Sequence, residues 1–475
     1  MSNDAAECVI KKPGSYFDGL AVSGQHKKIF LIIMLAYFFE QMDNNNFGYV
    51  AKSMFDTWGL APQAANHAMG LILSWYFIGM TLGGFLGGVI SDLIGRRKTF
   101  LGSIVIFSVS SIITGLPIDN VHVFALFRAL TGFGVFCMMV CSQVYIAEMA
   151  PAESRGKWQG MIGAVGFCAI PAIGLLCTII VPMSPEAWRW IFYFGGTGLV
   201  GFFLGVRYLK ESPRWLVNRN RRGEAESVIK MISGVSVDLS GEEGRVECRQ
   251  SVLQILGGMF SRRYIGRTLL LLALFCLVTP ATFVFASWMA KLLIGMQAVD
   301  PATGQLAAAF SQRTAMGIMS AITLGTPVGC FVASRIAEKG GRKIPLCGSY
   351  LVSGLGCLAF AFAPPSVPLL FVLGFIVCSS YMSGNMIMFT YASESFPTRM
   401  RNTATGTLNG AARLSVAAIQ SVIPVLFLAF AGANMGINPD IRISMLFCAV
   451  FFVLPLPLVL IFGKRTGGKS LEEIE

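Results

Sequence analysis

The chain has 475 residues, of which 54% are hydrophobic and only 13% charged, and its formal net charge is +12. Soluble globular proteins carry about a quarter charged residues, so this composition excludes a water-soluble enzyme. One membrane-spanning helix takes about 20 residues, which leaves room for roughly twelve of them with their connections. Continuous apolar runs such as 30–39 and 268–278 favour helices over the alternating strands of a membrane barrel.

Apolar windows of about 19 residues predict twelve membrane spans in chain order. They cover residues 29–51, 69–90, 99–116, 122–146, 158–181, 190–207, 268–290, 314–334, 345–363, 368–393, 403–431 and 443–462. The segment before the first span has no signal-peptide pattern. We therefore expect an all-α membrane protein with five parts: an N-terminal segment 1–28, a six-helix half 29–209, a linker 210–267, a second six-helix half 268–462 and a tail 463–475.

Basic residues are distributed unevenly between the two sides of these spans. Thirty of the 37 Lys and Arg fall on the side of both termini and the even-numbered connections, and five fall on the opposite side. Because cytoplasmic segments carry such an excess, both termini and the linker should be cytoplasmic, with a bacterial inner membrane as the expected location. The positive charge thus indicates orientation against anionic lipid and no nucleic-acid partner.

Twelve cysteines and three histidines raise the question of a metal or catalytic centre. Nearly all the cysteines lie inside apolar spans, where a thiol behaves as a small hydrophobic group. Cys137 and Cys141 share a helix face, but neither a histidine nor a carboxylate accompanies them. The histidines are scattered, and we find no nucleotide-binding motif. We expect no metal, no cofactor and no enzymatic activity.

Two short motifs occur twice at the same offset. D-x-x-G-R-R, beginning at Asp92, recurs 246 residues later as E-x-x-G-R-K from Glu338, and E-x-x-P-x-x-x-R recurs at the same offset from Glu148 to Glu394. A shared offset predicts two homologous six-helix halves in the same orientation. The linker between them is too short for a catalytic domain, although 223–232 and 249–259 have helical patterns.

These motifs and the 6+6 layout resemble the major facilitator superfamily over the whole chain. R-x-x-x-G-x-G from Arg128, E-S-P-R-W-L from Glu211 and the closing G-K-S-L-E-E-I resemble its sugar-porter group. F-E-Q-M-D, ending at Asp43, with W-G-L from Trp58 resembles instead its metabolite:proton symporters for organic and aromatic acids. The seventh span also lacks the Gln-Gln pair of hexose porters. The resemblance implies the major facilitator fold, with twelve transmembrane helices in two homologous six-helix halves.

Asp43 and Arg128 are charges inside predicted spans, where a charge costs about 2.5–3.5 kcal/mol and normally pairs within the bundle. At a rise of 1.5 Å per residue, both lie roughly 10 Å from the outer surface. The pair is either a static salt bridge or a proton site. The resemblance favours the proton site, because the family pairs a coupling carboxylate on this helix with the fourth-helix arginine. Glu40 either shares that site as a coupled carboxylate or is satisfied by Asn44 or Asn45.

A second polar group lies on the eleventh span. Arg413 is about 15 Å deep, near the midplane, with Asn409 and Gln420 on the same helix face. Such a stripe is either a substrate floor or a contact between helices. A guanidinium without a facing acid in its own half suits a carboxylate ligand, so we favour substrate contact. Weaker candidates for the same site are Asn385, Gln143 and Trp288.

The resemblance also implies a cytoplasmic gate built from the repeated motifs. Its candidate residues are Asp92, Arg96, Arg97, Glu148 and Arg155 in the first half and Glu338, Arg342, Glu394 and Arg401 in the second. Such pairs would hold the inner gate shut and break when the halves rock. Each exposed pair is worth only about 0–1 kcal/mol, although networks can exceed that.

Glycines 79, 83 and 87 form a ridge on the second span that permits close approach of another helix. The ridge could serve dimerisation, but packing inside a twelve-helix bundle is favoured, and we expect a monomer.

The expected function is secondary active transport, as proton-coupled symport of a small organic-acid-type metabolite by alternating access. The expected partners are that substrate, the proton and the lipid bilayer. An alternative is a sugar or polyol proton symporter or facilitator. From another class, a transporter-like nutrient sensor would bind ligand without accumulating it and would signal through the linker 210–267, which has no recognisable output domain.

Overall fold

The computed structural model describes residues 16–18, 22–239, 257–300, 304–337, 341–396, 398–430 and 437–463, without the side chains of 152, 153, 155, 398, 399, 401 and 402. Several expectations therefore lie outside the described residues. They are most of the N-terminal segment, nearly all of the tail, most of the helical piece 249–259, Glu338, and the side chains of Arg155 and Arg401.

The first half contains six spans. They are α1 (Gly24–Asn44) with α2 (Phe47–Thr57), α3 (Pro62–Ile94), α4 (Arg96–Gly115), α5 (Val121–Met149), α6 (Ala152–Ile180) with the short η1 (Val181–Met183), and α7 (Trp188–Gly195) with α8 (Gly198–Tyr208). The first span is broken at Asn45 and Asn46. The amide of Asn45 donates to the carbonyl of Gln41 at 2.9 Å, a side-chain bond that competes with the helical ladder.

The linker contributes α9 (Pro213–Asn218) and α10 (Arg222–Ser233), and α10 confirms the helix expected at 223–232. The second half again contains six spans. They are α12 (Ile265–Ile294), α13 (Gln312–Thr323) with α14 (Gly325–Ile336), α15 (Lys343–Ala361), α16 (Val367–Glu394), α17 (Thr398–Ala429), and α18 (Pro439–Val453) with α19 (Leu456–Phe462). One addition to the expected all-α fold is a hairpin of β1 (Gln297–Val299) and β2 (Leu306–Ala308), in which Gln297 pairs with Ala308.

Eleven helices or helix pairs in the described ranges are long and apolar enough to cross a membrane. The twelfth span is α1 with α2, which falls short in apolarity because α1 carries Lys27, Lys28, Glu40 and Asp43. The predicted twelve-helix architecture is therefore confirmed. The span of α1 with α2 carries the two candidate proton-coupling carboxylates, Glu40 and Asp43.

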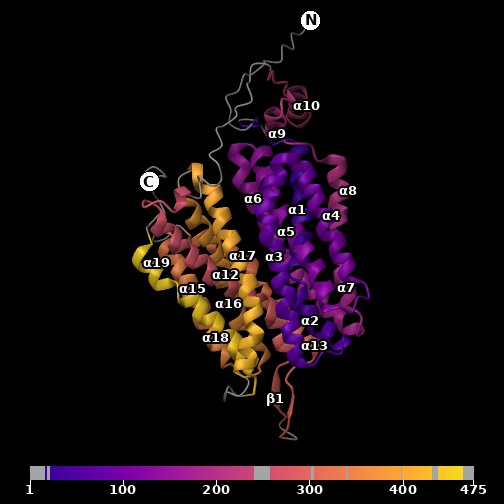
Figure 1. Ribbon diagram of the computed structural model, residues 1–475, viewed down its shortest axis with the longest axis vertical. Coiled ribbons are helices and arrows are strands. Elements are labelled where there is room, and N and C mark those ends of the chain that lie inside the picture. Colours follow the sequence, from indigo (N-terminus) through magenta and orange to yellow (C-terminus); the bar gives the residue numbers. More distant parts are fainter. Residues whose placement is uncertain are drawn as a thin grey trace.

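The two halves stand side by side, the first in purple and the second in orange and yellow in Figure 1. We call the end of the bundle with α9 and α10 the linker end, and the end with β1 and β2 the hairpin end. The hydrogen bonds described between the halves lie toward the hairpin end. They join Lys291 to Asn66, Gln312 to Ser53 at 2.5 Å, Ser320 to Pro171 at 3.1 Å, and Ser74 to both Ser421 and Ala417 at 2.7 Å.

The glycine ridge of α3 packs against α5 inside the first half. A Cβ added at Gly79 would overlap the carbonyl oxygen of Ala129, and one at Gly83 would overlap that of Phe133. At Gly87 an added Cβ would lie 3.0 Å from Cys137. The ridge thus serves close packing of two helices within the chain, as expected, and it fixes the position of α5 and of Arg128 on it.

Candidate functional site

Asp43 and Arg128 form a buried ion pair within the first half, as their matching depths predict. Nη1 of Arg128 lies 3.0 Å from Oδ2 of Asp43, and the two side chains are 2% and 0% exposed. Oδ1 of Asp43 accepts two further hydrogen bonds, at 2.6 Å from the Ser111 hydroxyl and at 3.1 Å from the side-chain amide of Asn46. Both carboxylate oxygens therefore have donors, and the charge is compensated inside one half of the bundle.

The surrounding helices hold this pair in place. The guanidinium carbon of Arg128 lies 4.7 Å from the centre of the Tyr76 ring, and the Tyr76 hydroxyl donates to Asn44 at 2.7 Å. Gly195 on α7 leaves the space for the carboxylate, because an added Cβ would overlap the Ser111 hydroxyl and lie 2.7 Å from Oδ1 of Asp43. The pair is thus enclosed by α1, α3, α4, α5 and α7.

Glu40 lies three residues before Asp43 and is just as buried, with 1% of its area exposed. The one described hydrogen bond to its carboxylate comes from the side-chain amide of Gln41 at 3.2 Å. Asn44 and Asn45, the expected partners in the purely structural interpretation, bond elsewhere, to Tyr76 and to the carbonyl of Gln41. That interpretation is therefore wrong in its partners, and Glu40 is left with weak compensation.

Arg413 on α17 lies at the interface between the halves. Its guanidinium carbon is 4.6 Å from the centre of the Phe283 ring in its own half and 5.1 Å from that of Phe136 in the other. Its Nε and Nη1 are buried and have no hydrogen-bond partner among the described residues. It also attracts Glu40 electrostatically across the interface. This cation therefore has donors available for a ligand.

The other members of the polar stripe on α17 are placed differently. Gln420 is fully buried, and its Oε1 accepts a hydrogen bond from the Trp288 indole at 2.6 Å. Its Nε2 has no partner in the described part of the chain. Asn409 is partly exposed, nearer the linker end of the same helix. Trp288 also packs edge-to-face on Phe427 at 5.4 Å, so in this conformation it is a packing residue.

The two weakest substrate candidates do not join Arg413. Asn385 accepts a hydrogen bond from the Tyr350 hydroxyl at 2.9 Å and donates to Thr282 at 3.5 Å, all within the second half. Gln143 lies seven residues beyond Phe136 on α5, which at 1.5 Å per residue is about 10 Å farther toward the linker end. A contact of Gln143 with the substrate therefore stays a prediction.

A small pocket opens beside the break in the first span, between the two halves. The space among its lining atoms, open solvent included, is about 340 Å³. Its polar lining includes Asn44, Asn45 and Arg128 from the first half and Ser287 from the second. Phe283 also lines the pocket, and its ring is in contact with Arg413.

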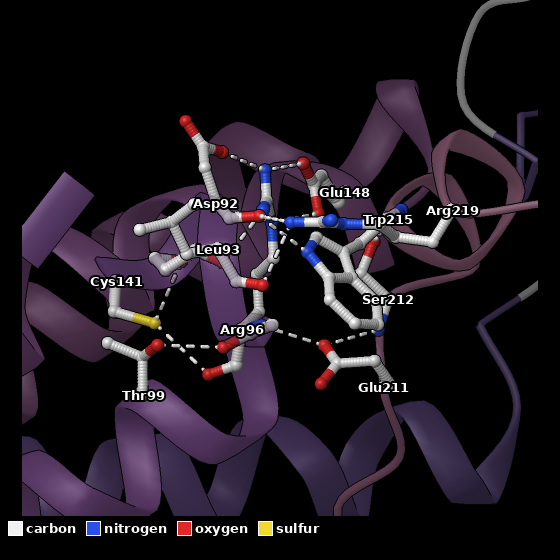
Figure 2. Close-up of polar contacts among 12 residues, drawn as sticks. Asp92, Leu93, Arg96, Thr99, Cys141, Glu148, Glu211, Ser212, Trp215 and Arg219 are labelled. Carbon is white, nitrogen blue, oxygen red and sulfur yellow. Dashed lines mark hydrogen bonds and ion pairs between the residues drawn. The ribbon is translucent and has the colours of Figure 1, made fainter. Parts of the chain in front are cut away.

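At the linker end of the first half, the repeated motif forms an ion-pair network (Figure 2). Nη2 of Arg96 lies 2.9 Å from Asp92, and its Nε lies 3.1 Å from Glu148. Arg97 instead donates to the carbonyl of Val206 at 2.7 Å. The expected contact between Asp92, Arg96 and Glu148 is confirmed, although its role in gating stays a prediction.

The segment after the sixth span lies beside this network, as Figure 2 shows. Glu211 accepts the backbone N–H groups of Arg96 at 2.8 Å and Arg97 at 3.1 Å, so it caps the first turn of α4. The Trp215 indole donates to the carbonyl of Asp92 at 2.9 Å, near the end of α3. The E-S-P-R-W-L motif thus fixes the connection between α3 and α4.

The second copy of the motif makes the corresponding contact in its own half. Nε of Arg342 lies 2.6 Å from Glu394, and Lys343 donates to the carbonyl of Gly463 at 3.1 Å. The described pairs Arg96–Glu148 and Arg342–Glu394 each join two helices of one half. Separation of the halves at this end therefore does not require either pair to break, and a role of these contacts in gating stays a prediction.

Three groups that complete the buried site were not predicted: Ser111, Asn46 and Tyr76. The run of three asparagines after Asp43 inside an apolar span was an available signal for Asn46. Ser111 and Tyr76 come from other helices, and hydropathy alone does not show which of their faces meets the ion pair.

Both the sequence and the fold of the chain are similar to those of known proteins. The profile of the Major Facilitator Superfamily matches residues 33–420. The chain belongs to this family. It is similar to YyaJ of Bacillus subtilis, which is named as a metabolite transport protein, at 26% identity over 96% of each chain. It is also similar to the niacin transporter NiaP of Acinetobacter baylyi, at 23% identity over 97% of this chain and 99% of that one.

Among solved structures, the chain shares its fold with the xylose transporter XylE of E. coli in a partially occluded inward-open conformation. The TM-score is 0.71 at 19% identity, over 94% of this chain and 100% of XylE. The protein is therefore a multi-pass membrane transporter of the Major Facilitator Superfamily.

Proposed function

We propose that the protein is a proton-coupled symporter of a small organic-acid-type metabolite and that it works by alternating access as a monomer. The observation that carries the proposal is Arg413, a cation at the interface of the halves with two buried donor atoms unpaired among the described residues. Desolvating such a group is costly, and a carboxylate is the ligand that a guanidinium binds with two parallel hydrogen bonds. The niacin transporter among its relatives is named for a pyridine carboxylate, which supports the same substrate class.

Orientation follows from the charges at the two ends. The excess of basic residues at the linker end supports a cytoplasmic location of that end, in a bacterial inner membrane. The hydrogen bonds between the halves then lie toward the outside, as between Lys291 and Asn66. We therefore propose that the conformation described here is closed to the outside and corresponds to the inward-facing side of the transport cycle.

Matched pairs of carboxylates and their neutral amides test the substrate class. Nicotinate with nicotinamide, and benzoate with benzamide, are added to the purified protein, and binding is measured by thermal shift and calorimetry. A ligand at 100 times its Kd adds about 2.7 kcal/mol of stability. Because charge-assisted hydrogen bonds contribute about 1.5–3 kcal/mol, Arg413→Gln should weaken carboxylate binding about 10- to 150-fold.

Arg413→Lys should weaken carboxylate binding less than Arg413→Gln does, because lysine keeps the charge and loses only the planar fork. Arg442→Gln, which removes an arginine stacked on Phe362 elsewhere in the second half, is the matched control and should change nothing. Equal losses for an acid and its amide would make Arg413 structural. Binding of xylose but of no carboxylate would instead favour the sugar symporter.

A further inference from the structure

Glu40 and Asp43 are equally buried and lie on the same helix, but their partners differ. Each is 1% exposed. Asp43 has three side-chain donors, one of them the guanidinium of Arg128. Glu40 has a single described donor, the amide of Gln41, and no cation within ion-pair distance among the described residues. One neutral donor is too little to compensate an ionised carboxylate in a dry interior. The described residues of the first half therefore do not compensate a charge on Glu40.

The remaining compensation for Glu40 comes from the other half. The charged and titratable groups around it are Tyr37 and Asp43 on α1, Tyr76 on α3, Arg128 on α5 and Arg413 on α17. Of the two cations, Arg128 is already paired with Asp43, and Asp43 itself repels a charge on Glu40. Arg413 is therefore the cation that stabilises an ionised Glu40. It is also the cation that we assign to the substrate carboxylate.

We propose that Glu40, rather than Asp43, carries the transported proton, and that substrate binding at Arg413 loads it. This inference rests on the proposed function. When the substrate carboxylate pairs with the guanidinium, Arg413 no longer compensates Glu40. A carboxylate oxygen of Glu40 then takes one proton from a hydronium ion. One O–H bond forms on Glu40, which becomes a neutral acid, and one O–H bond breaks in the hydronium ion, which becomes water. When the substrate leaves, Arg413 again attracts Glu40, which releases the proton.

This coupling has two consequences. One proton and one monoanionic substrate cross together, so the transported complex carries no net charge. By linkage, the effect is reciprocal: protonation of Glu40 frees Arg413 for the substrate, so carboxylate affinity should rise as pH falls, by up to tenfold per pH unit. The Asp43–Arg128 pair stays closed throughout and holds α1 against α5.

Infrared titration of the purified protein without ligand tests the assignment. The acid-minus-neutral difference spectrum should contain a protonated-carboxyl band that is absent from Glu40→Gln and retained in Asp43→Asn. In Arg413→Gln this band should persist to higher pH than in the unaltered protein, whereas Arg442→Gln should match the unaltered protein. Loss of the band in Asp43→Asn and its retention in Glu40→Gln would overturn the assignment. Should Glu40→Gln not fold, an unmoved band in Arg413→Gln would overturn it.

Binding measurements test the coupling separately. Nicotinate affinity should depend on pH in the unaltered protein and in Asp43→Asn and should lose that dependence in Glu40→Gln. A pH dependence that survives in Glu40→Gln would overturn the inference. Equal binding of nicotinate and nicotinamide would contradict the proposed function, because it would mean that Arg413 does not bind a substrate carboxylate. The infrared spectra are recorded without ligand, so they test the assignment of Glu40 independently of that result.

Discussion

Arg128 and Arg413, two arginines inside the bundle of this transporter, have opposite surroundings. Arg128 lies within one half, paired with a carboxylate whose other oxygen accepts bonds from Ser111 and Asn46. Arg413 lies between the halves, where two aromatic rings flank it and two of its nitrogens have no described partner. The difference indicates a division of labour. A compensated charge can hold one rigid half together, whereas an uncompensated charge at a moving interface can respond to a ligand and to the other half.

Replacing each arginine with methionine should give the largest difference in stability between the two sites. Arg128→Met leaves Asp43 without its cation in a buried site and should lower the free energy of unfolding by about 3–5 kcal/mol. Arg413→Met removes a group that is poorly satisfied, so its cost should stay within about 1 kcal/mol. Denaturant titration in detergent measures both. Adding Asp43→Asn to Arg128→Met should recover part of the loss, and equal costs for the two arginines would contradict the comparison.

Filling the space beside Asp43 should give the next largest effect. Gly195→Ala places a methyl group against the Ser111 hydroxyl and 2.7 Å from Oδ1 of Asp43, so overpacking should cost about 1–3 kcal/mol. Gly102→Ala on α4 is the control, because nothing lies within 4 Å of its added Cβ. That substitution should be neutral or stabilising by up to about 1 kcal/mol. A Gly195→Ala variant as stable as its control would mean that the carboxylate is not tightly enclosed.

Lys291, a partly buried cation, extends the comparison because it has a hydrogen-bond partner across the interface. It donates to Asn66 of the other half and lies 5.4 Å from the centre of the Trp288 ring. Lys291→Met should remove a contact made only when the hairpin end is closed, and shift the population by about 0.5–1.5 kcal/mol toward opening there. Labelling of a cysteine placed at Ser53 by an impermeant thiol reagent should become faster. An unchanged labelling rate would show that this contact does not hold the hairpin end shut.

The ion pairs at the linker end should give the smallest effects. Glu148→Gln and Glu394→Gln each weaken a contact within one half, so each should cost about 0–1 kcal/mol of stability. Neither should change which end of the bundle is accessible to thiol labelling. A clear shift in accessibility would restore the gating role expected from the repeated motifs.

The sequence predicts much of the architecture, because hydropathy indicates the membrane spans and the spacing of the repeated motifs indicates the two halves. It also predicts the pairing of Asp43 with Arg128, since two buried opposite charges at equal depth have few alternatives. It does not predict the partner of Glu40 or the aromatic rings around Arg413. Those contacts depend on which helix faces meet between the halves, and on the conformation that the halves adopt. The hairpin of β1 and β2 lies in a connection without a strong hydropathy signal.

Uptake into proteoliposomes tests the central claim most directly. Nicotinate uptake is measured under an inward proton gradient alone, and under a potassium diffusion potential alone. Protein-free liposomes correct for passive entry of the neutral acid, and Glu40→Gln proteoliposomes are measured beside the unaltered protein. The account predicts protein-dependent accumulation driven by the proton gradient, no response to the potential, and no accumulation by Glu40→Gln. Accumulation driven by the potential, or undiminished in Glu40→Gln, would contradict it.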